Sequence, residues 1–357
     1  MSEKNSTQRL TVGPAPHLRS KGNTTQLMKF LSIILILPTI GGIYYFGLNA
    51  LLVVLTSVIT CILVEYVAKR LRQQEYRLDY SAVVTGILFA LVLPPTVPLW
   101  MVVLGAAIAI GIVKEAFGGL GYNIFNPALA GRAFLAICFA LTMTTWVAPI
   151  SNPLGVDTVT TATPLSESFE YVGSQSQLYT DMLLGNIGGC IGETSALLIL
   201  IAGVILIFTG IIKWHIPVIY IGTVGFLTFL LGQDPLFHIL AGGLFLGAFF
   251  MATDYVTIPM TRKGQMIFAF CAGLIVVIIR LYGNMPEGVA FSILLMNGFT
   301  PLIDRYVRPT PYGYVPPEKK GGFLKSEKLK ETEECKVKDK KSQKKKTASK
   351  QTGGKKK

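Results

Sequence analysis

Hydrophobic runs separated by short polar segments make up most of this chain. Several runs approach the roughly 20 apolar residues that an α-helix needs to cross the hydrocarbon core of a bilayer. The pattern therefore predicts an all-α polytopic membrane protein with about ten transmembrane helices. The runs fall at 30–46, 50–67, 81–93, 99–113, 128–146, 185–212, 216–231, 236–251, 266–279 and 288–303.

Proline and glycine interrupt several of these runs. The third run stops at Pro94-Pro95, where the backbone cannot easily continue a helix. Glycine is dense at 118–127 and at 185–193, and 297–301 combines Asn, Gly and Pro. Non-helical backbone at membrane depth is tolerated only inside protein or beside a cavity, and paired discontinuous helices occur in inverted repeats. These breaks indicate two five-helix repeats, with two unrelated halves as the alternative.

The charges in the loops predict which side of the membrane each loop faces. Lys69 and Arg70 follow the second run, and Arg262 and Lys263 follow the eighth. Short loops rich in Lys and Arg stay in the cytoplasm, so both termini are expected there. Segment 147–181 holds four acidic residues and neither Lys nor Arg, so it should face outside. The expected divisions are a cytoplasmic N-terminal segment (1–28), a first transmembrane half (29–146), an extracytoplasmic loop (147–181), a second transmembrane half (182–308) and a cytoplasmic tail (309–357).

The composition is that of a membrane protein, and most of the net positive charge lies in the C-terminal tail. Of the 357 residues, 51% are hydrophobic and 15% are charged, against roughly 25% charged residues in soluble domains. The formal net charge is +13, and residues 318–357 alone contain sixteen Lys and six acidic residues. We expect this tail to be disordered, and to aid solubility or contact anionic lipid headgroups. It brings no aromatic platform, so no nucleic-acid partner is expected.

A threonine-rich stretch in the acidic loop is the main candidate for chemistry. Residues 157–163 read Asp-Thr-Val-Thr-Thr-Ala-Thr. Threonines in a polar loop are usually only solvated, but this stretch resembles the flavinylation signature Asp-x-x-Ser/Thr-Gly-Ala-Thr, whose last threonine forms a phosphoester with FMN. The resemblance assigns covalent FMN to Thr163, with Asp157, Thr160 and Ala162 as parts of the attachment motif. Thr161 stands at the glycine position of the signature, where the backbone is therefore less permissive.

Further motifs extend the resemblance over roughly residues 15–308. The stretches at 121–134, 249–259, 286–291 and 297–304 all resemble the RnfD/NqrB family. The length and the wording Thr-Ala-Thr-Pro-Leu favour RnfD, the membrane-embedded D component of the Rnf ion-translocating electron transport complex. Several separated motifs in one order make the resemblance specific, and the Lys-rich tail lies outside it.

The resemblance implies a flavin-carrying membrane subunit of an ion-translocating ferredoxin:NAD oxidoreductase in a bacterial or archaeal cell membrane. Electrons would pass through the covalent FMN, coupled to transport of Na⁺ or H⁺. A second, non-covalent flavin, riboflavin, is expected within the membrane body. The implied partners are a second flavinylated subunit, iron–sulfur subunits, an NADH-binding subunit and, for maturation, a flavin transferase that donates FMN from FAD.

Polar residues inside or beside the hydrophobic runs are further candidates, because ionisable groups in a bilayer are costly and often functional. Glu193 lies in the glycine-rich part of the sixth run, so we expect it to line a cofactor or ion pocket. Asn126 and Arg132 are candidates for the same kind of pocket. Four other acidic residues near run ends are more simply interpreted as helix caps or interfacial ion pairs: Glu65, Glu115, Asp254 and Asp304.

A different class of function fits part of the pattern. Broken helices and a repeat would also suit a stand-alone channel or secondary transporter without a redox role. The threonine motif outside the membrane is the feature that such a protein does not need. His17, His215 and His238 are isolated in the sequence and lack metal-ligand spacing, so no metal site is expected.

Overall fold

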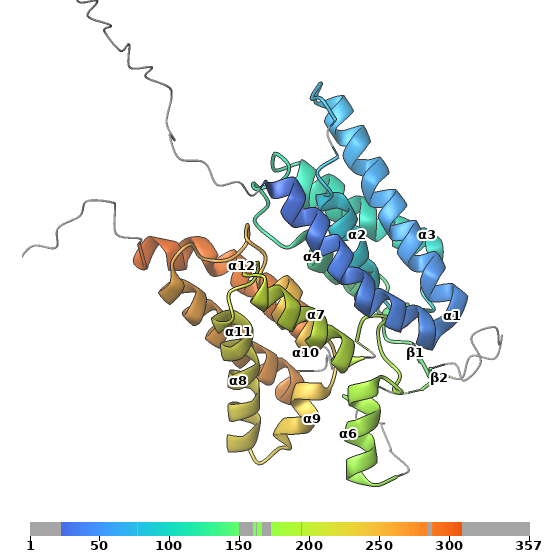
Figure 1. Cartoon of the computed structure of the whole chain (residues 1–357), viewed down its shortest axis with the longest axis vertical. Helices are drawn as coiled ribbons and strands as arrows, with labels where there is room; N and C mark the ends of the chain where they lie inside the picture. The colour runs from blue at the N-terminus through green and yellow to red at the C-terminus, as the bar shows by residue number, and fades with distance from the viewer. Residues whose placement is uncertain are drawn as a thin grey trace, which may run out of the picture. The chain divides into compact units, whose positions relative to one another are not determined.

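The computed structural model describes residues 23–76, 78–149, 160–161, 163–165, 173–193, 195–283 and 288–308. Nearly all regular structure in these ranges is helical (Figure 1). The predicted N-terminal segment up to residue 22 and the Lys-rich tail lie outside the described residues. The elements, with η for a π-helix, are α1 (Thr24–Leu71), α2 (Ser81–Leu91), α3 (Leu99–Ala107), η1 (Ile108–Glu115), α4 (Pro127–Cys138), α5 (Ala140–Met143), β1 (Trp146–Val147), β2 (Thr160–Thr161), α6 (Gln175–Leu184), α7 (Ala196–Phe208), α8 (His215–Leu230), α9 (Pro235–Leu240), α10 (Leu244–Leu246), η2 (Gly247–Met251), α11 (Arg262–Tyr282) and α12 (Val289–Tyr306).

The first two predicted runs both lie on α1, which turns back on itself at Gly47 (Figure 1). Gly47 has φ 68° and ψ −148°, a conformation that glycine adopts because it has no Cβ to clash. Among the described residues, α1 and α11 are long and apolar enough to cross a membrane. The other apolar helices are shorter, so the arrangement of ten crossings in two repeats stays a prediction.

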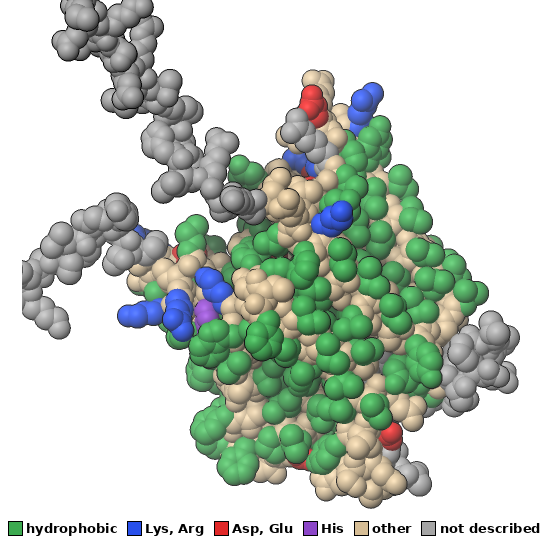
Figure 2. All heavy atoms as spheres, viewed as in Figure 1, with side chains coloured by type: hydrophobic (Ala, Val, Ile, Leu, Met, Phe, Trp, Pro, Cys, Tyr) green, Lys and Arg blue, Asp and Glu red, His purple; other side chains and the backbone are tan. Residues whose placement is uncertain are grey.

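Hydrophobic side chains cover much of the outer surface. Figure 2 shows them over most of one face, with Lys and Arg gathered toward its upper and left edges. Leu48, Leu63 and Phe208 are among the large apolar residues that are more than half exposed. Soluble proteins rarely expose a contiguous apolar patch larger than a few hundred Å², so this surface is suited to contact with lipid.

Two of the predicted helix interruptions meet inside the molecule. α2 ends at Leu91, before the double proline, and the glycine-rich stretch before α7 is not helical. The N–H of Ile191 donates to the carbonyl of Leu93 at 3.0 Å, and that of Gly192 donates to the carbonyl of Leu91 at 2.7 Å. Each broken segment therefore supplies hydrogen-bond partners for backbone groups of the other that have no partner within a helix. Buried backbone N–H and C=O groups need such partners.

This contact depends on glycine at position 192. A Cβ there would lie 2.6 Å from the Cβ of Leu91 and 2.9 Å from its carbonyl oxygen. Gly192→Ala is expected to lower the unfolding temperature in detergent, because overpacking costs about 1–3 kcal/mol. Gly222→Ala on α8 is the matched control, since a Cβ there meets nothing within 4 Å. Equal unfolding temperatures for the two variants would contradict this close packing.

The helices differ from the predicted runs in three places. The predicted break at 297–301 is wrong, because α12 continues through Pro301; one missing N–H donor is tolerated where the surroundings satisfy the backbone. The run 128–146 is helical only to Cys138 in α4, and after the short α5 it ends in β1. The run 236–251 is divided into α9, α10 and η2, and Gly242 between them has φ +68°.

Candidate functional site

A short β-ladder holds Thr160 and Thr161 of the threonine stretch. β1 and β2 are antiparallel, with Trp146 opposite Thr161 and Val147 opposite Thr160. Both β1 residues are buried, so β2 is held against the interior. Thr163 follows two residues after β2 and is only 4% exposed. The hydroxyl predicted to carry the flavin therefore faces the protein interior.

The rest of the predicted attachment motif is only partly described. Thr160 lies in β2, where its backbone pairs with β1. Asp157 and Ala162 lie outside the described residues. Their roles stay predictions.

Thr163 and Glu193, thirty positions apart in the sequence, line the same pocket. The other walls come from Met182 on α6, from residues 187–189, and from residues 240–242 at the end of α9. The pocket encloses about 410 Å³ of space between protein atoms and is partly open at the surface. The structure thus brings together the two residues that the sequence proposed for different reasons.

Glycines leave room for the carboxylate of Glu193. A Cβ at Gly243 would lie 2.7 Å from Glu193 Oε1, and one at Gly189 would lie 3.6 Å from Oε2. The N–H of Cys190 donates to Oε2 at 3.4 Å. Arg132 reaches the same stretch from α4, where its Nη2 donates to Cys190 Sγ at 3.6 Å. Arg132 therefore supports the segment that carries Glu193 and is not among the residues that line the pocket.

Two short helices close this pocket. The hydroxyl of Tyr179 on α6 donates to Asp234, the N-cap residue of α9. Gln175 Nε2 donates to the same carboxylate at 3.1 Å. Because Met182 on α6 and Leu240 on α9 both line the pocket, this link between the helices keeps its walls together.

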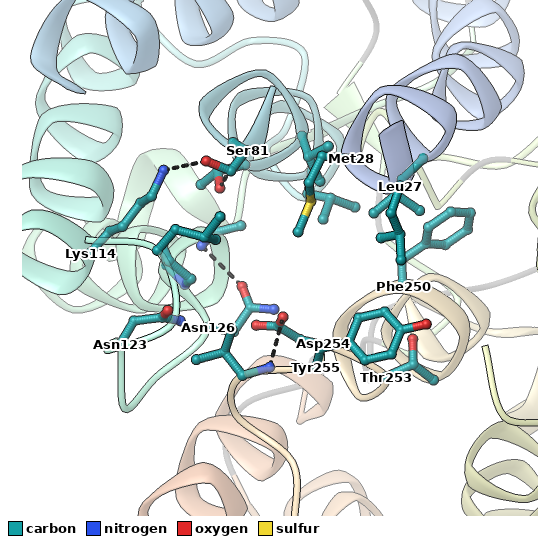
Figure 3. A pocket seen from close by; sticks show the side chains of 18 of the residues that line it. Leu27, Met28, Ser81, Lys114, Asn123, Asn126, Phe250, Thr253, Asp254 and Tyr255 are labelled. Atoms are coloured by element: carbon teal, nitrogen blue, oxygen red, sulfur yellow. Dashed lines mark hydrogen bonds between the residues drawn. The ribbon is translucent and has the colours of Figure 1, made fainter. Parts of the chain in front are cut away.

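A second pocket lies among segments of both predicted halves (Figure 3). It encloses about 750 Å³ of space between atoms and is also partly open. The polar side chains of Asn123, Asn126 and Asp254 gather on one side, and Met28 and Phe250 lie on another (Figure 3). Asn126, predicted for the same kind of pocket as Glu193, thus lines a different pocket.

Two polar residues of this second pocket, Asn126 and Asp254, form side-chain hydrogen bonds only to residues that follow them closely in the chain. Asn126 Oδ1 caps α4 by accepting from Ala128 N at 3.1 Å and Leu129 N at 3.4 Å. The Asp254 carboxylate accepts from the N–H of Val256 and the hydroxyl of Thr257, both at 3.4 Å. Burial raises the pKa of the Asp254 carboxyl above its ordinary value, although these two hydrogen bonds oppose the shift. Its oxygens can therefore serve a bound molecule.

A buried ion-pair cluster borders the second pocket. Lys114 Nζ donates to Glu65 Oε1 at 2.8 Å and to Ser81 Oγ at 2.6 Å (Figure 3 shows the contact to Ser81). Lys69 Nζ lies 3.0 Å from the same Glu65 oxygen. Lys114 and Ser81 both line the pocket. The cluster therefore connects a pocket wall to the basic end of α1.

Two of the four acidic residues near run ends form the predicted ion pairs, and Asp304 forms a backbone hydrogen bond instead. Glu65 pairs with two lysines, and Glu115 pairs with Arg72. Asp304 accepts from the N–H of Met260 at 3.0 Å. Asp254 instead lines the second pocket.

The sequence did not predict that Lys114, Asn123 and Asp254 share one pocket. Lys114 looks like the polar end of a hydrophobic run, and Asn123 looks like part of a glycine-rich packing loop. The signal that could have found the pocket is that the Asn123 and Asp254 stretches are two of the separated motifs behind the family resemblance.

Comparison with known proteins decides the family. Residues 11–313 match the model of the family described as "NQR2, RnfD, RnfE family", which covers most of the chain. The chain belongs to the NQR2, RnfD, RnfE family. This membership confirms the resemblance found in the sequence and makes the chain a membrane protein.

Relatives in this family are D components of ion-translocating complexes. The chain is 46% identical over 319 residues to the D component of the proton-translocating ferredoxin:NAD(+) oxidoreductase complex of Clostridium ljungdahlii, covering 85% of this chain and 96% of that protein. It is 48% identical over 310 residues to the D component of the Na(+)-translocating ferredoxin:NAD(+) oxidoreductase complex of Acetobacterium woodii, covering 85% and 95%. The D component of the ion-translocating oxidoreductase complex of Vibrio cholerae is 36% identical over 345 residues, covering 85% and 99%. Two relatives of similar identity are named for different ions, so similarity does not identify the coupling ion.

Proposed function

We propose that this chain is the flavin-carrying D component of an Rnf-type complex that couples electron transfer between ferredoxin and NAD to transport of Na⁺ or H⁺. The observation that carries the proposal is the position of Thr163. This threonine ends a flavinylation-like motif and lines a pocket with Glu193. The names of the relatives support the redox and ion-transport parts of the proposal.

Attachment would join the Thr163 hydroxyl oxygen to the flavin-side phosphorus of FAD. A P–O bond forms there, the pyrophosphate P–O bond breaks, AMP leaves, and the hydroxyl proton is released. The bound FMN supplies the redox chemistry, and the protein fixes its position and surroundings. Because Thr163 is 4% exposed behind α6 and α9, attachment must precede closure of this pocket or require it to open.

The orientation belongs to the proposal. The chain would cross the membrane several times, with both termini in the cytoplasm and the Thr163 pocket on the outer side, where the flavin transferase acts. Basic residues lie at the end of α1, at the start of α11 and at the end of α12; they include Arg70, Arg262 and Arg308. Because short basic segments stay in the cytoplasm, these residues support placing all three helix ends on the cytoplasmic side. The partners would be a second flavinylated subunit, iron–sulfur subunits and an NADH-binding subunit.

The second pocket is the proposed site of a non-covalent flavin, riboflavin. A flavin ring has an apolar end and a polar edge with hydrogen-bond donors and acceptors. Asn123, Asn126 and Asp254 can bind the polar edge, and Met28 and Phe250 can pack against the ring (Figure 3). A mostly apolar pocket with a few convergent polar groups is the usual form of a cofactor site.

Asp254→Ala is expected to reduce non-covalent flavin binding by about tenfold or more, because a hydrogen bond to a charged group contributes about 1.5–3 kcal/mol. The measurement is flavin fluorescence released into solution when the purified protein is denatured, per mole of protein. Asp304→Asn is the control, since Asp304 is bound to Met260 N and lies outside the residues lining this pocket. Unchanged release from Asp254→Ala would count against this pocket.

Expression with and without a flavin transferase tests the proposed function. The purified chain is denatured on a gel and inspected for flavin fluorescence. We expect a fluorescent band only when the transferase is present. No band in either case would contradict the proposal and favour a channel or transporter without a redox role.

A further inference from the structure

Arg280 is a cation near the end of α11, at the opposite end of that helix from Arg262. Its Nη1 donates to the carbonyl of His238 at 2.6 Å, and its Nη2 donates to the carbonyl of Ala241 at 2.9 Å. The Nε atom is buried and has no hydrogen-bond partner among the described residues. Within those residues, no Asp or Glu lies within ion-pair distance of Arg280. Glu193, the anion of the Thr163 pocket, acts on this guanidinium from beyond ion-pair distance. A buried cation is unfavourable without a closely paired anion, and Arg280 has no such partner among the described residues.

The guanidinium lies against the wall of the Thr163 pocket. Ala241, whose carbonyl it binds, and Gly242 both line that pocket. A Cβ on Gly242 would lie 3.0 Å from Leu165 Cδ1 and 3.2 Å from Arg280 Nη2. Leu165, two residues after Thr163, and the Arg280 guanidinium therefore lie beside the same side of Gly242, and a side chain at this position would occupy the space between them.

A phosphodiester on Thr163 would bring a negative charge into this pocket. The carboxylate of Glu193 lies in the same pocket, so a second anion there is repelled unless a cation is near. Burial of an unpaired charge is strongly unfavourable, and arginine is the side chain best suited to pair with phosphate. Among the described residues, Arg280 is a cation whose guanidinium contacts the pocket wall at Ala241.

We infer that Arg280 is a positioning residue that supplies the counter-charge for the flavin phosphodiester on Thr163. The inference rests on the proposed function, because it needs a flavin at Thr163. It also explains why an arginine, and not a neutral donor, holds the carbonyls of His238 and Ala241. The alternative is that Arg280 has only a structural role, in which it binds these two carbonyls whether or not flavin is attached.

The test separates these two roles by comparing flavinylated with unmodified protein. Wild type, Arg280→Gln, Arg280→Lys and the control Arg262→Gln are each expressed with and without the flavin transferase. The readouts are the time course of covalent flavin fluorescence on denaturing gels and the unfolding temperature in detergent. Arg262 is an arginine at the other end of the same helix, so its loss should change neither.

We expect flavinylation of Arg280→Gln to be slower by about tenfold or more, the effect of losing a charge-assisted hydrogen bond. Flavinylation should raise the unfolding temperature of wild type and of Arg280→Lys more than that of Arg280→Gln. An equal rate and an equal temperature gain for Arg280→Gln and wild type would overturn the inference and leave the proposed function standing. Wild type without any covalent flavin would overturn both.

Gly242→Ala decides the question if Arg280→Gln does not fold. This substitution keeps the charge but inserts a methyl group between Leu165 and Arg280. Because Gly242 has φ +68°, alanine also strains the backbone, and this strain is present with and without flavin. The deciding readout is therefore the gain in unfolding temperature on flavinylation, and a smaller gain than in wild type supports the inference. A gain equal to that of wild type overturns it.

Discussion

Thr163→Val is expected to abolish covalent flavinylation, because valine has nearly the shape of threonine but no oxygen to form the phosphoester. The pocket should survive, since Thr163 is 4% exposed and a methyl group replaces its hydroxyl. In the assembled complex, loss of this flavin should also stop ferredoxin-dependent NAD reduction. In-gel fluorescence of protein made with the flavin transferase measures the first effect, and NAD reduction by the purified complex measures the second.

Thr161→Gly is the matched control for this substitution. It also removes a threonine hydroxyl from the stretch, but it restores the glycine of the flavinylation signature. We expect this variant to be flavinylated at least as fast as wild type, because glycine makes the backbone more permissive. If fluorescence persists in Thr163→Val, or disappears in Thr161→Gly, a residue other than Thr163 carries the flavin.

Lys114→Met is expected to destabilise the protein strongly. Lys114 and Glu65 are 2% and 1% exposed and lie 2.8 Å apart. Removing one partner of a buried pair costs about 3–5 kcal/mol, because it leaves the other charge buried without compensation. Glu65 keeps Lys69 at 3.0 Å, which should hold the effect near the lower end of that range. The measurement is the unfolding temperature in detergent.

A double variant tests the cause of this effect. Glu65→Gln removes the charge that Lys114→Met leaves uncompensated, so the double variant should be more stable than Lys114→Met alone. Lys263→Met, at the exposed start of α11, should behave like wild type. A double variant less stable than either single variant would mean that charge compensation is not the reason for the loss.

The part of the site that the sequence predicts depends on local signals. Thr163 follows from a motif of adjacent residues, and Glu193 follows from an acidic residue in a glycine-rich stretch of a hydrophobic run. Their meeting in one pocket depends on how distant segments fold together. The sequence predicts the two helix interruptions from Pro94-Pro95 and from glycine density, but it cannot show that their backbones pair with each other.

The residues that the sequence missed are those whose roles depend on distant partners. Lys114 looks like an ordinary polar end of a helix, and it becomes a buried charge only because Glu65, 49 positions away, lies beside it. Arg280 likewise lies near the end of a helix, and its carbonyl partners lie 42 and 39 positions away. The wrong prediction of a break at Pro301 has the same origin, because the surroundings of a proline in a helix decide whether the helix continues.

Mass spectrometry of peptides from protein made with the flavin transferase identifies the flavinylated residue directly. We expect one peptide that carries FMN, and fragmentation should locate the modification on the hydroxyl of Thr163. The same peptide from protein made without the transferase should be unmodified. FMN on Thr160 or Thr161, or no modified peptide despite full sequence coverage of 147–181, would contradict attachment of the flavin to Thr163.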